Sequence, residues 1–356
     1  MIGIIGFANL RIMQYLKKYT DILDANGVEY EVVYWNRDGG EESIDFKGVT
    51  IPFDYNMNTY QSFYKKIGGF LRYTYFMYKT IKQRKYDKIV ILTTQTAVPL
   101  FKILLGKYKD KYIFDYRDIT KEKIPPYKAL VKKLIKNSYF TAISSMGFKK
   151  IIGESDKYVM SHNCSNLKFE ETKERNKEKI NISFWGLVRH IELNKQICDV
   201  FGNDERFNLY YHGDGFYKEL KDYCDEKQYN NVYVTGRYNR DEIKVFADNT
   251  DIVHCVYDND EVMKLAMQVK LYDAVRYKKP ILVQKGSYAE EFLKKYAIGL
   301  SFDINSDIKE EIYNWFKSGN AEKVIANYDK LLQDIVSDDI NFEKRLMEFV
   351  NEKTIF

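Results

Sequence analysis

The chain has 356 residues, with 56 Lys and Arg against 51 Asp and Glu, which gives a net charge of +5. This length exceeds the roughly 250–300 residues that a single hydrophobic core serves, so we expect two domains. The four cysteines form no Cys-x-x-Cys pair, which argues against a zinc ribbon or a disulfide framework and favours the cytoplasm. We expect no membrane span and no leader, because no run approaches ~20 apolar residues and the start lacks a basic segment.

Short β-rich runs alternate twice with helix-like stretches, which predicts parallel sheets covered by helices. The strands expected in the first half are Ile2–Ile5, Tyr30–Tyr34, Lys88–Leu92, Tyr112–Asp115 and Phe140–Ile143. Those expected in the second half are Ile182–Trp185, Leu209–Tyr211, Val232–Thr235, Ile252–Val256 and Ile281–Val283. The alternation predicts a first domain over 1–165, a polar linker over 166–180, a second domain over 181–340 and a terminal helix over 341–356.

The first half is strongly basic. Residues 60–150 contain 21 Lys and Arg against 5 Asp and Glu, a balance of +16 that leaves −11 for the remainder. Within this region, 63–85 and 127–136 read as basic helices with aromatic residues beside their cations. Such helices suit an anionic membrane surface, and solvated helices with an apolar core stripe explain them equally well. We expect no nucleic-acid partner, because no recognised nucleic-acid module is present.

Four motifs each follow a strand of the second half. Gly186 precedes Arg189 and Lys195, and the later motifs are 212–215 (His-Gly-Asp-Gly), 236–238 (Gly-Arg-Tyr) and 270–273 (Lys-Leu-Tyr-Asp). The carboxyl ends of parallel strands share one edge of a sheet, so these motifs should lie on one rim. A pair of phosphates needs fixed cations, backbone N–H groups or a metal ion, and Arg189 and Lys195 could meet one pyrophosphate from two sides.

In this order and spacing, the series resembles the C-terminal half of GT-B glycosyltransferases. The resemblance is closest to the large retaining family (group 1, family 4) of bacterial capsule, exopolysaccharide and lipopolysaccharide synthesis. It implies an α/β fold with two doubly wound Rossmann-like domains facing a cleft, and a C-terminal helix that crosses back to the first domain. It also implies a cytoplasmic enzyme, peripheral on the inner face of the membrane, that transfers sugar from a UDP-sugar to a glycan or polyprenyl-linked acceptor. No further cofactor is implied.

The resemblance assigns roles to individual residues. Lys270 would lie over the donor phosphates, and Asp273 takes the position of the acid that binds the ribose hydroxyls. Tyr238 would line the base pocket, while the glycines would let the backbone approach the donor, although ordinary turns explain the glycines too. The expected donor-binding residues are Gly6, Arg189, Lys195, Gly213, Gly215, Gly236, Arg237, Tyr238, Lys270, Leu271 and Asp273.

The chain departs from the family pattern at one position. The family shows Glu-x7-Glu, whereas Leu265 stands eight positions before Asp273, and Gln268 or Lys264 would replace the missing acid. Retention or inversion of the anomeric centre therefore stays open. Two other functions also stay open, a non-catalytic GT-B partner subunit and a sugar-nucleotide epimerase.

In the first domain, Asp118 and Arg117 follow the strand Tyr112–Asp115. Similar enzymes carry side chains here that reach the donor sugar and the acceptor hydroxyl. We therefore expect Asp118 to be the acceptor-side carboxylate and Arg117 to steady developing charge; an Arg–Asp ion pair that closes the loop is the alternative. The four histidines share no ligand spacing with thiols or carboxylates, which predicts a metal-independent reaction.

Overall fold

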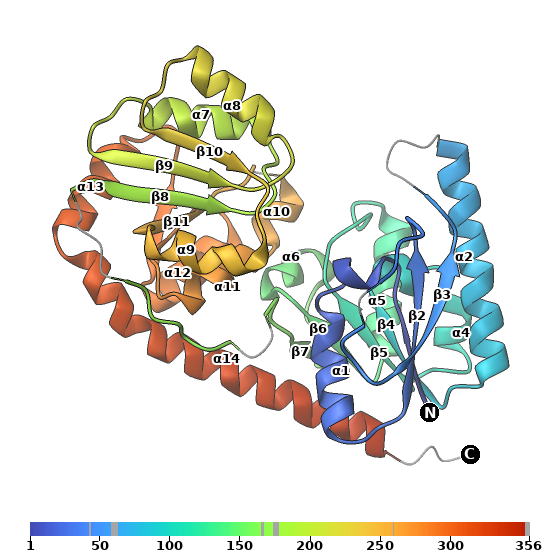
Figure 1. Cartoon of the computed structure of the whole chain (residues 1–356). Coiled ribbons are helices and arrows are strands. Elements are labelled where there is room, and N and C mark those ends of the chain that lie inside the picture. Colours follow the sequence, from blue (N-terminus) through green and yellow to red (C-terminus); the bar gives the residue numbers. More distant parts are fainter. Residues whose placement is uncertain (43, 58–62, 165–166, 174–177, 259, 353–356) are drawn as a thin grey trace. The chain divides into compact units, whose positions relative to one another are not determined.

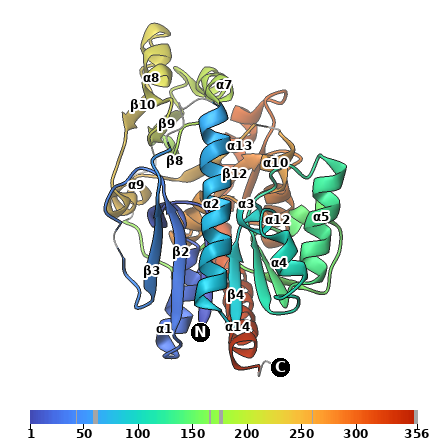
Figure 2. The same ribbon diagram turned by 90° about the vertical axis from the view of Figure 1, so that its right-hand side faces the viewer.

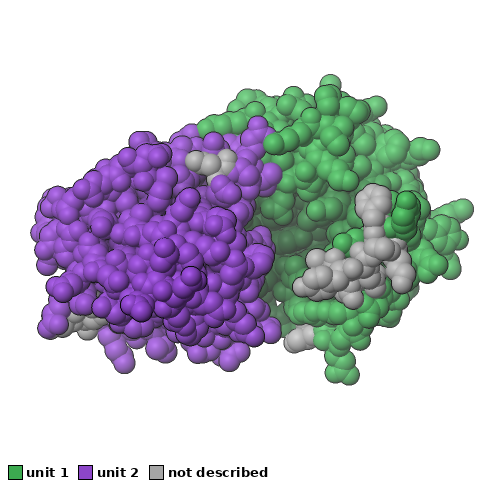
Figure 3. Space-filling model, turned by 90° about the horizontal axis from the view of Figure 1, so that it is seen from above, with its two compact units in different colours: residues 1–165, 337–356 green, residues 166–336 purple. Residues whose placement is uncertain are grey.

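The computed structural model describes residues 1–42, 44–57, 63–164, 167–173, 178–258 and 260–352 (Figure 1). The chain divides into two compact units, coloured separately in Figure 3. Unit 1 comprises residues 1–165 and 337–356, and unit 2 comprises residues 166–336. Among the described residues, no helix combines the length and apolar character needed to cross a membrane.

The described part of unit 1 contains a seven-stranded parallel sheet in the order β3-β2-β1-β4-β5-β6-β7. Its strands are β1 (Ile2–Ile5), β2 (Tyr30–Asn36), β3 (Val49–Asp54), β4 (Lys88–Leu92), β5 (Tyr112–Tyr116), β6 (Phe140–Ile143) and β7 (Tyr158–Met160). Its helices are α1 (Leu16–Ala25), α2 (Phe63–Arg84), α3 (Thr94–Ala97), α4 (Phe101–Leu105), α5 (Pro125–Lys136) and α6 (Lys149–Ile152). The five strands expected for this half are all present, and β3 and β7 are edge strands that the sequence did not reveal.

Alternation of side chains along the strands decides which helix covers which face. Ile2, Ile4 and Val32 share one core cluster with Tyr19 of α1 and Phe342 of α14 (Asn320–Asn351). Figure 2 shows α2, α4 and α5 on the opposite face of the sheet. The expected terminal helix is thus the last part of α14, a longer helix that begins in unit 2.

The described part of unit 2 contains a six-stranded parallel sheet in the order β10-β9-β8-β11-β12-β13. Its strands are β8 (Ile180–Trp185), β9 (Phe207–His212), β10 (Val232–Gly236), β11 (Ile252–Cys255), β12 (Ile281–Gln284) and β13 (Gly299–Phe302). Its helices are α7 (Ile191–Phe201), α8 (Tyr217–Glu226), α9 (Ile243–Asp248), α10 (Glu261–Leu265), α11 (Val269–Arg276), α12 (Tyr288–Tyr296), α13 (Ile308–Lys317) and the start of α14. The doubly wound α/β fold is confirmed in both units.

Candidate functional site

The centre of the second sheet is where the chain reverses its winding. Strands β8 and β11 are neighbours, yet Figure 1 shows α7 on one face of the sheet and α11 on the other. Loops that leave adjacent strands toward opposite faces leave room between them, and ligands of doubly wound sheets bind at this switch point. The motifs after β8, β9 and β10 and the start of α11 all lie at this edge.

Glycines let two of these loops pack backbone against backbone. The N–H of Gly186 donates to the carbonyl of His212 at 2.8 Å, and the N–H of Gly213 donates to the carbonyl of Gly236 at 2.7 Å. A Cβ on Gly213 would overlap the carbonyl of Gly186, and one on Gly215 would meet the carbonyl of Val188. Gly213 and Gly215 therefore bring the loops together, a role that the sequence did not distinguish from approach to a ligand.

Lys270 is the most unusual side chain at this edge. Its side chain is buried, and its Nζ lies 2.7 Å from the centroid of the Phe184 ring and 5.1 Å from that of Tyr257. The ammonium makes no hydrogen bond with any residue that the structure describes. Burial lowers the pKa of Lys270 to about 7, and the nearby Arg189 also lowers it, while Cys255 and Asp273 act in the opposite direction. An unpaired buried cation is costly, so this position favours an anionic ligand.

The two other expected cations differ from Lys270. Arg189 is exposed and follows Val188, whose N–H is held by the carbonyl of Asp214 at 2.8 Å. Lys195 instead forms ion pairs with Glu192 at 3.1 Å and Glu219 at 3.0 Å. The charge of Arg189 reaches Lys270 and lowers its pKa, whereas Lys195 would first have to leave two carboxylates to bind an anion.

Asp273 and Tyr238 lie on the β10 side of Lys270. The Asp273 carboxylate is 17% exposed and 3.8 Å from Nη2 of Arg240, and burial raises its pKa. Burial, with a contribution from the Asp273 charge, raises the pKa of the Tyr238 hydroxyl to about 12. The Tyr238 ring meets Phe246 edge-on at 5.2 Å. A half-buried aromatic ring beside a carboxylate can bind a base and a ribose.

The remaining expected residues of unit 2 have more ordinary surroundings. Arg237 is 84% exposed, with its Nε 3.9 Å from the carboxylate of Asp214. Leu271 is completely buried in α11 and contributes to packing. Gly236 adopts φ +82°, and a Cβ there would press on the ring of Tyr217.

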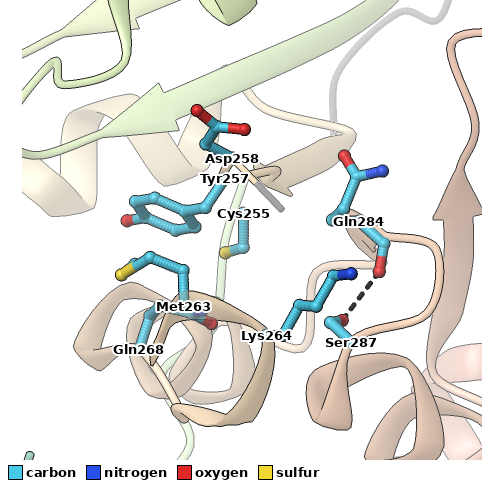
Figure 4. Close-up of a pocket in the computed structure, with 8 residues that line it drawn as sticks. All are labelled: Cys255, Tyr257, Asp258, Met263, Lys264, Gln268, Gln284 and Ser287. Carbon is cyan, nitrogen blue, oxygen red and sulfur yellow. Dashed lines mark hydrogen bonds between the residues drawn. The ribbon is translucent and has the colours of Figure 1, made fainter. Parts of the chain in front are cut away.

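A pocket opens beside Lys270, at the ends of β11 and β12 (Figure 4). It is a small pocket, and part of its space is open to solvent. Its lining residues are Cys255, Tyr257, Asp258, Met263, Lys264, Gln268, Gln284 and Ser287. Sequence analysis proposed Gln268 and Lys264 as substitutes for a missing acid but missed Tyr257, Gln284 and Ser287. All three stand within three residues of the end of β11 or β12, so a search of the residues around the strand ends would have included them.

In unit 1, the adjacent residues Arg117 and Asp118 have different surroundings. Arg117 is buried and forms a two-pronged ion pair with Asp115, with Nε–Oδ1 at 2.5 Å and Nη2–Oδ2 at 2.9 Å. Its Nη1 donates to the carbonyl of Ser161 at 2.8 Å, and its Nη2 donates to that residue's hydroxyl at 2.7 Å. Asp118 is exposed. The alternative expected from the sequence, an ion pair that closes the loop, therefore describes Arg117, with Asp115 as its partner.

Gly6 is buried at the end of β1. Its carbonyl accepts a hydrogen bond from the hydroxyl of Tyr73, and its N–H donates to Val33 at 2.9 Å. A Cβ there would overlap the side chain of Met13. Gly6 thus serves a tight turn.

Among the residues that the structure describes, no group of three or more His, Cys, Asp and Glu side chains could hold a metal ion.

Comparison with known proteins identifies the fold. No protein-family model matches the sequence, and no curated protein matches it at significant similarity, so membership of the retaining family stays a prediction. Sucrose-phosphate synthase from Thermosynechococcus elongatus superimposes with a TM-score of 0.77, at 10% identity over 98% of each chain. HepE from Anabaena, in complex with UDP and glucose, gives 0.69 at 11% identity, over 97% of this chain and 99% of HepE.

The lipopolysaccharide outer core galactosyltransferase WaaB gives a TM-score of 0.64 at 13% identity, over 98% of each chain. These similarities extend over both units. The chain therefore has the GT-B glycosyltransferase fold. At identities this low, the comparison establishes the architecture, and the function must be argued from the site.

Proposed function

We propose that the protein is a glycosyltransferase that moves a sugar from a nucleotide diphosphate, a UDP-sugar, to a glycan or lipid-linked glycan acceptor. The observation that carries this proposal is the buried, unpaired ammonium of Lys270 at the switch point of the second sheet. A diphosphate would supply the acceptors that Lys270 lacks, and Arg189 would contact it from the adjoining loop. Two protein cations can stabilise the departing diphosphate without a metal ion.

Two further observations support a uridine nucleotide. Asp273 and Tyr238 lie together on one side of Lys270, where a carboxylate can accept from ribose hydroxyls and a ring can stack on the base. HepE, which shares the fold, was solved with UDP and with UDP-glucose. We propose retention of configuration, on the match of Lys270 and Asp273 to the pattern of the retaining family.

The acceptor side is proposed to lie in unit 1, with Asp118 as its carboxylate. This residue stands two positions after the end of β5 and is exposed. WaaB, with the same fold, is a lipopolysaccharide outer core galactosyltransferase. This similarity supports, for the present protein, a role in the synthesis of a capsule or another cell-surface polysaccharide.

Unit 1 also has a surface suited to a membrane. On α2, Tyr64, Ile67, Leu71 and Tyr75 recur at intervals of three or four residues, and each is exposed, Tyr64 by 85% and Tyr75 by 71%. We call this row the α2 stripe. On α5, Val131, Leu134 and Ile135 are buried, while Lys132, Lys133 and Lys136 are exposed. We propose that unit 1 rests on the anionic cytoplasmic face of the membrane.

The test incubates the protein with a panel of UDP-sugars and of lipid-linked or glycan acceptors. Turnover is measured as the release of UDP and as the increase in the mass of the acceptor. Release of UDP with a heavier acceptor supports the proposal. Tight UDP binding without turnover would instead indicate a non-catalytic partner subunit, which the buried Leu265 at the usual acid position favours. Conversion of one UDP-sugar into its epimer would indicate an epimerase.

A further inference from the structure

The pocket of Figure 4 lies at the ends of β11 and β12, whereas Tyr238 follows β10. Tyr257 lines the pocket, and the centroid of its ring is 5.1 Å from Nζ of Lys270. The strand order places β10 on one side of the switch point and β12 on the other. A diphosphate at Lys270 with its nucleoside toward Tyr238 would therefore direct its other substituent, the sugar, into this pocket.

The pocket contains polar groups that lack partners. Lys264 is half-buried, and its ammonium takes part in no hydrogen bond or ion pair among the described residues. The Oε1 of Gln268 is buried and likewise unpaired there. Figure 4 shows the Lys264 side chain pointing toward Gln284 and Ser287, whose hydroxyl donates to the Gln284 carbonyl at 2.7 Å.

The pocket is lined by one cation, Lys264, and one carboxylate, Asp258. Leu265, at the usual position of the acid, is buried and apolar. The carboxylate that does line the pocket, Asp258, is 64% exposed and lies 3.8 Å from Nδ1 of His190. Solvent screens such an exposed charge, whereas the half-buried ammonium of Lys264 is screened less.

We propose that this pocket binds the sugar of the donor and selects a sugar that carries a carboxylate, a hexuronic acid. The inference rests on the proposed function, because it assumes a nucleotide diphosphate at Lys270. A sugar carboxylate would accept a charge-assisted hydrogen bond from Lys264. A hydroxyl of the bound sugar can donate to the unpaired Oε1 of Gln268. A neutral hexose would leave the Lys264 ammonium without an anion, so discrimination follows from the unpaired group.

The experiment compares dissociation constants of UDP, UDP-glucose and UDP-glucuronate by calorimetry for the full chain. We expect UDP-glucuronate to bind about tenfold or more tightly than UDP-glucose, the effect of one charge-assisted hydrogen bond. Lys264→Gln should reduce that ratio to within about twofold while UDP affinity stays unchanged, and Lys264→Arg should keep it. Lys285→Gln is the matched control, because Lys285 pairs with Asp303 and does not line the pocket.

Each outcome bears on a separate claim. UDP binding with equal affinity for both UDP-sugars would overturn the selection of a hexuronic acid and leave the proposed function intact. A preference that survives Lys264→Gln, or that falls equally in Lys285→Gln, would overturn the role of Lys264. Failure to bind UDP at all would contradict the proposed function itself.

Discussion

The ammonium of Lys270 rests on the face of Phe184, 2.7 Å from the centroid of the ring. An aromatic face attracts a cation but accepts no strong hydrogen bond, so it holds Lys270 in place without satisfying it. Phe184 belongs to β8 and Lys270 to α11. These two elements are far apart in the sequence and meet at the switch point. This contact gives the protein a cation that is positioned in advance and available to a ligand.

UDP affinity should depend on pH through Lys270. Because the pKa of Lys270 is lowered to about 7, its amine loses its charge above that pH, and a bound diphosphate favours the charged form. We expect UDP affinity to fall above pH 7, by up to about tenfold per pH unit. Calorimetry at several pH values between about 6.5 and 9 measures the dissociation constant of UDP and checks this prediction. Lys270→Met is the control and should show little change over the same range.

The same pKa has a consequence for stability. In the unfolded chain the lysine recovers its ordinary pKa of about 10.4, so the unfolded state binds more protons between about pH 7 and 10. The free energy of unfolding contributed by Lys270 should therefore rise with pH across this window. Relative to Lys270→Met, the wild-type protein should be least stable below pH 7, and the difference should shrink toward pH 10.

Gly213→Ala should destabilise unit 2 severely. The added Cβ would overlap the backbone carbonyl of Gly186, which cannot move without breaking the paired loops. We expect a loss of more than about 3 kcal/mol in the free energy of unfolding, or no folded protein. Gly286→Ala is the control: its φ is +78°, but nothing lies within 4 Å, so it should cost only about 1 kcal/mol of strain. Similar losses in both variants would contradict the packing argument.

Substitutions of the adjacent residues Arg117 and Asp118 should have different effects, the first on stability and the second on sugar transfer. Arg117→Ala leaves Asp115 buried without its cation, which should cost about 3–5 kcal/mol of stability. Asp118→Asn changes an exposed side chain and should cost less than about 1 kcal/mol while reducing sugar transfer. Chemical denaturation and turnover of both variants distinguish these effects. An Asp118→Asn variant with normal turnover would remove this carboxylate from the proposed mechanism.

The α2 stripe should bring the protein to anionic liposomes. Leu71→Ser combined with Tyr75→Ser should weaken sedimentation with anionic vesicles, because these two exposed side chains supply apolar area to the interface. Reversal of the charge of Lys132 and Lys133 should weaken it further and make it less sensitive to salt, since screening acts within about 10 Å at 0.1 M. Val245→Ser, an exposed apolar position of unit 2, is the control. No sedimentation of the wild-type protein would return α2 to an ordinary surface helix.

How far the sequence predicted the fold can be seen from the strands. All ten expected strands form, and most are buried runs of β-branched and aromatic residues. The exception is β10, a partly exposed edge strand whose Val-x-Val pattern still revealed it. The three that were missed, β3, β7 and β13, are edge strands. Pro52 lies within β3 and Gly299 begins β13, while β7 has only three residues. Edge strands need less apolar surface, so their sequences carry a weaker pattern.

The site was predicted less completely, for a physical reason. Most of the proposed residues stand after strands and were found in that way, because the position of a strand end follows from the pattern of the chain, although Tyr257, Gln284 and Ser287 were missed. Side-chain contacts were not predicted. The spacing of residues shows neither that Lys270 lies over the Phe184 ring nor that Arg117 pairs with Asp115. Lys195 shows the same limit, since its pairing with Glu219 depends on how α7 packs beside α8.

The most direct test of the account is a calorimetric titration of the wild-type protein and Lys270→Met with UDP near pH 7. The account predicts measurable binding by the wild-type protein and a loss of about 10- to 100-fold in Lys270→Met, because a charge-assisted contact to the diphosphate disappears. Thermal unfolding should show that the variant is folded and at least as stable, since methionine removes an unpaired buried charge. Equal UDP affinity in the two folded proteins would contradict the claim that Lys270 binds the donor.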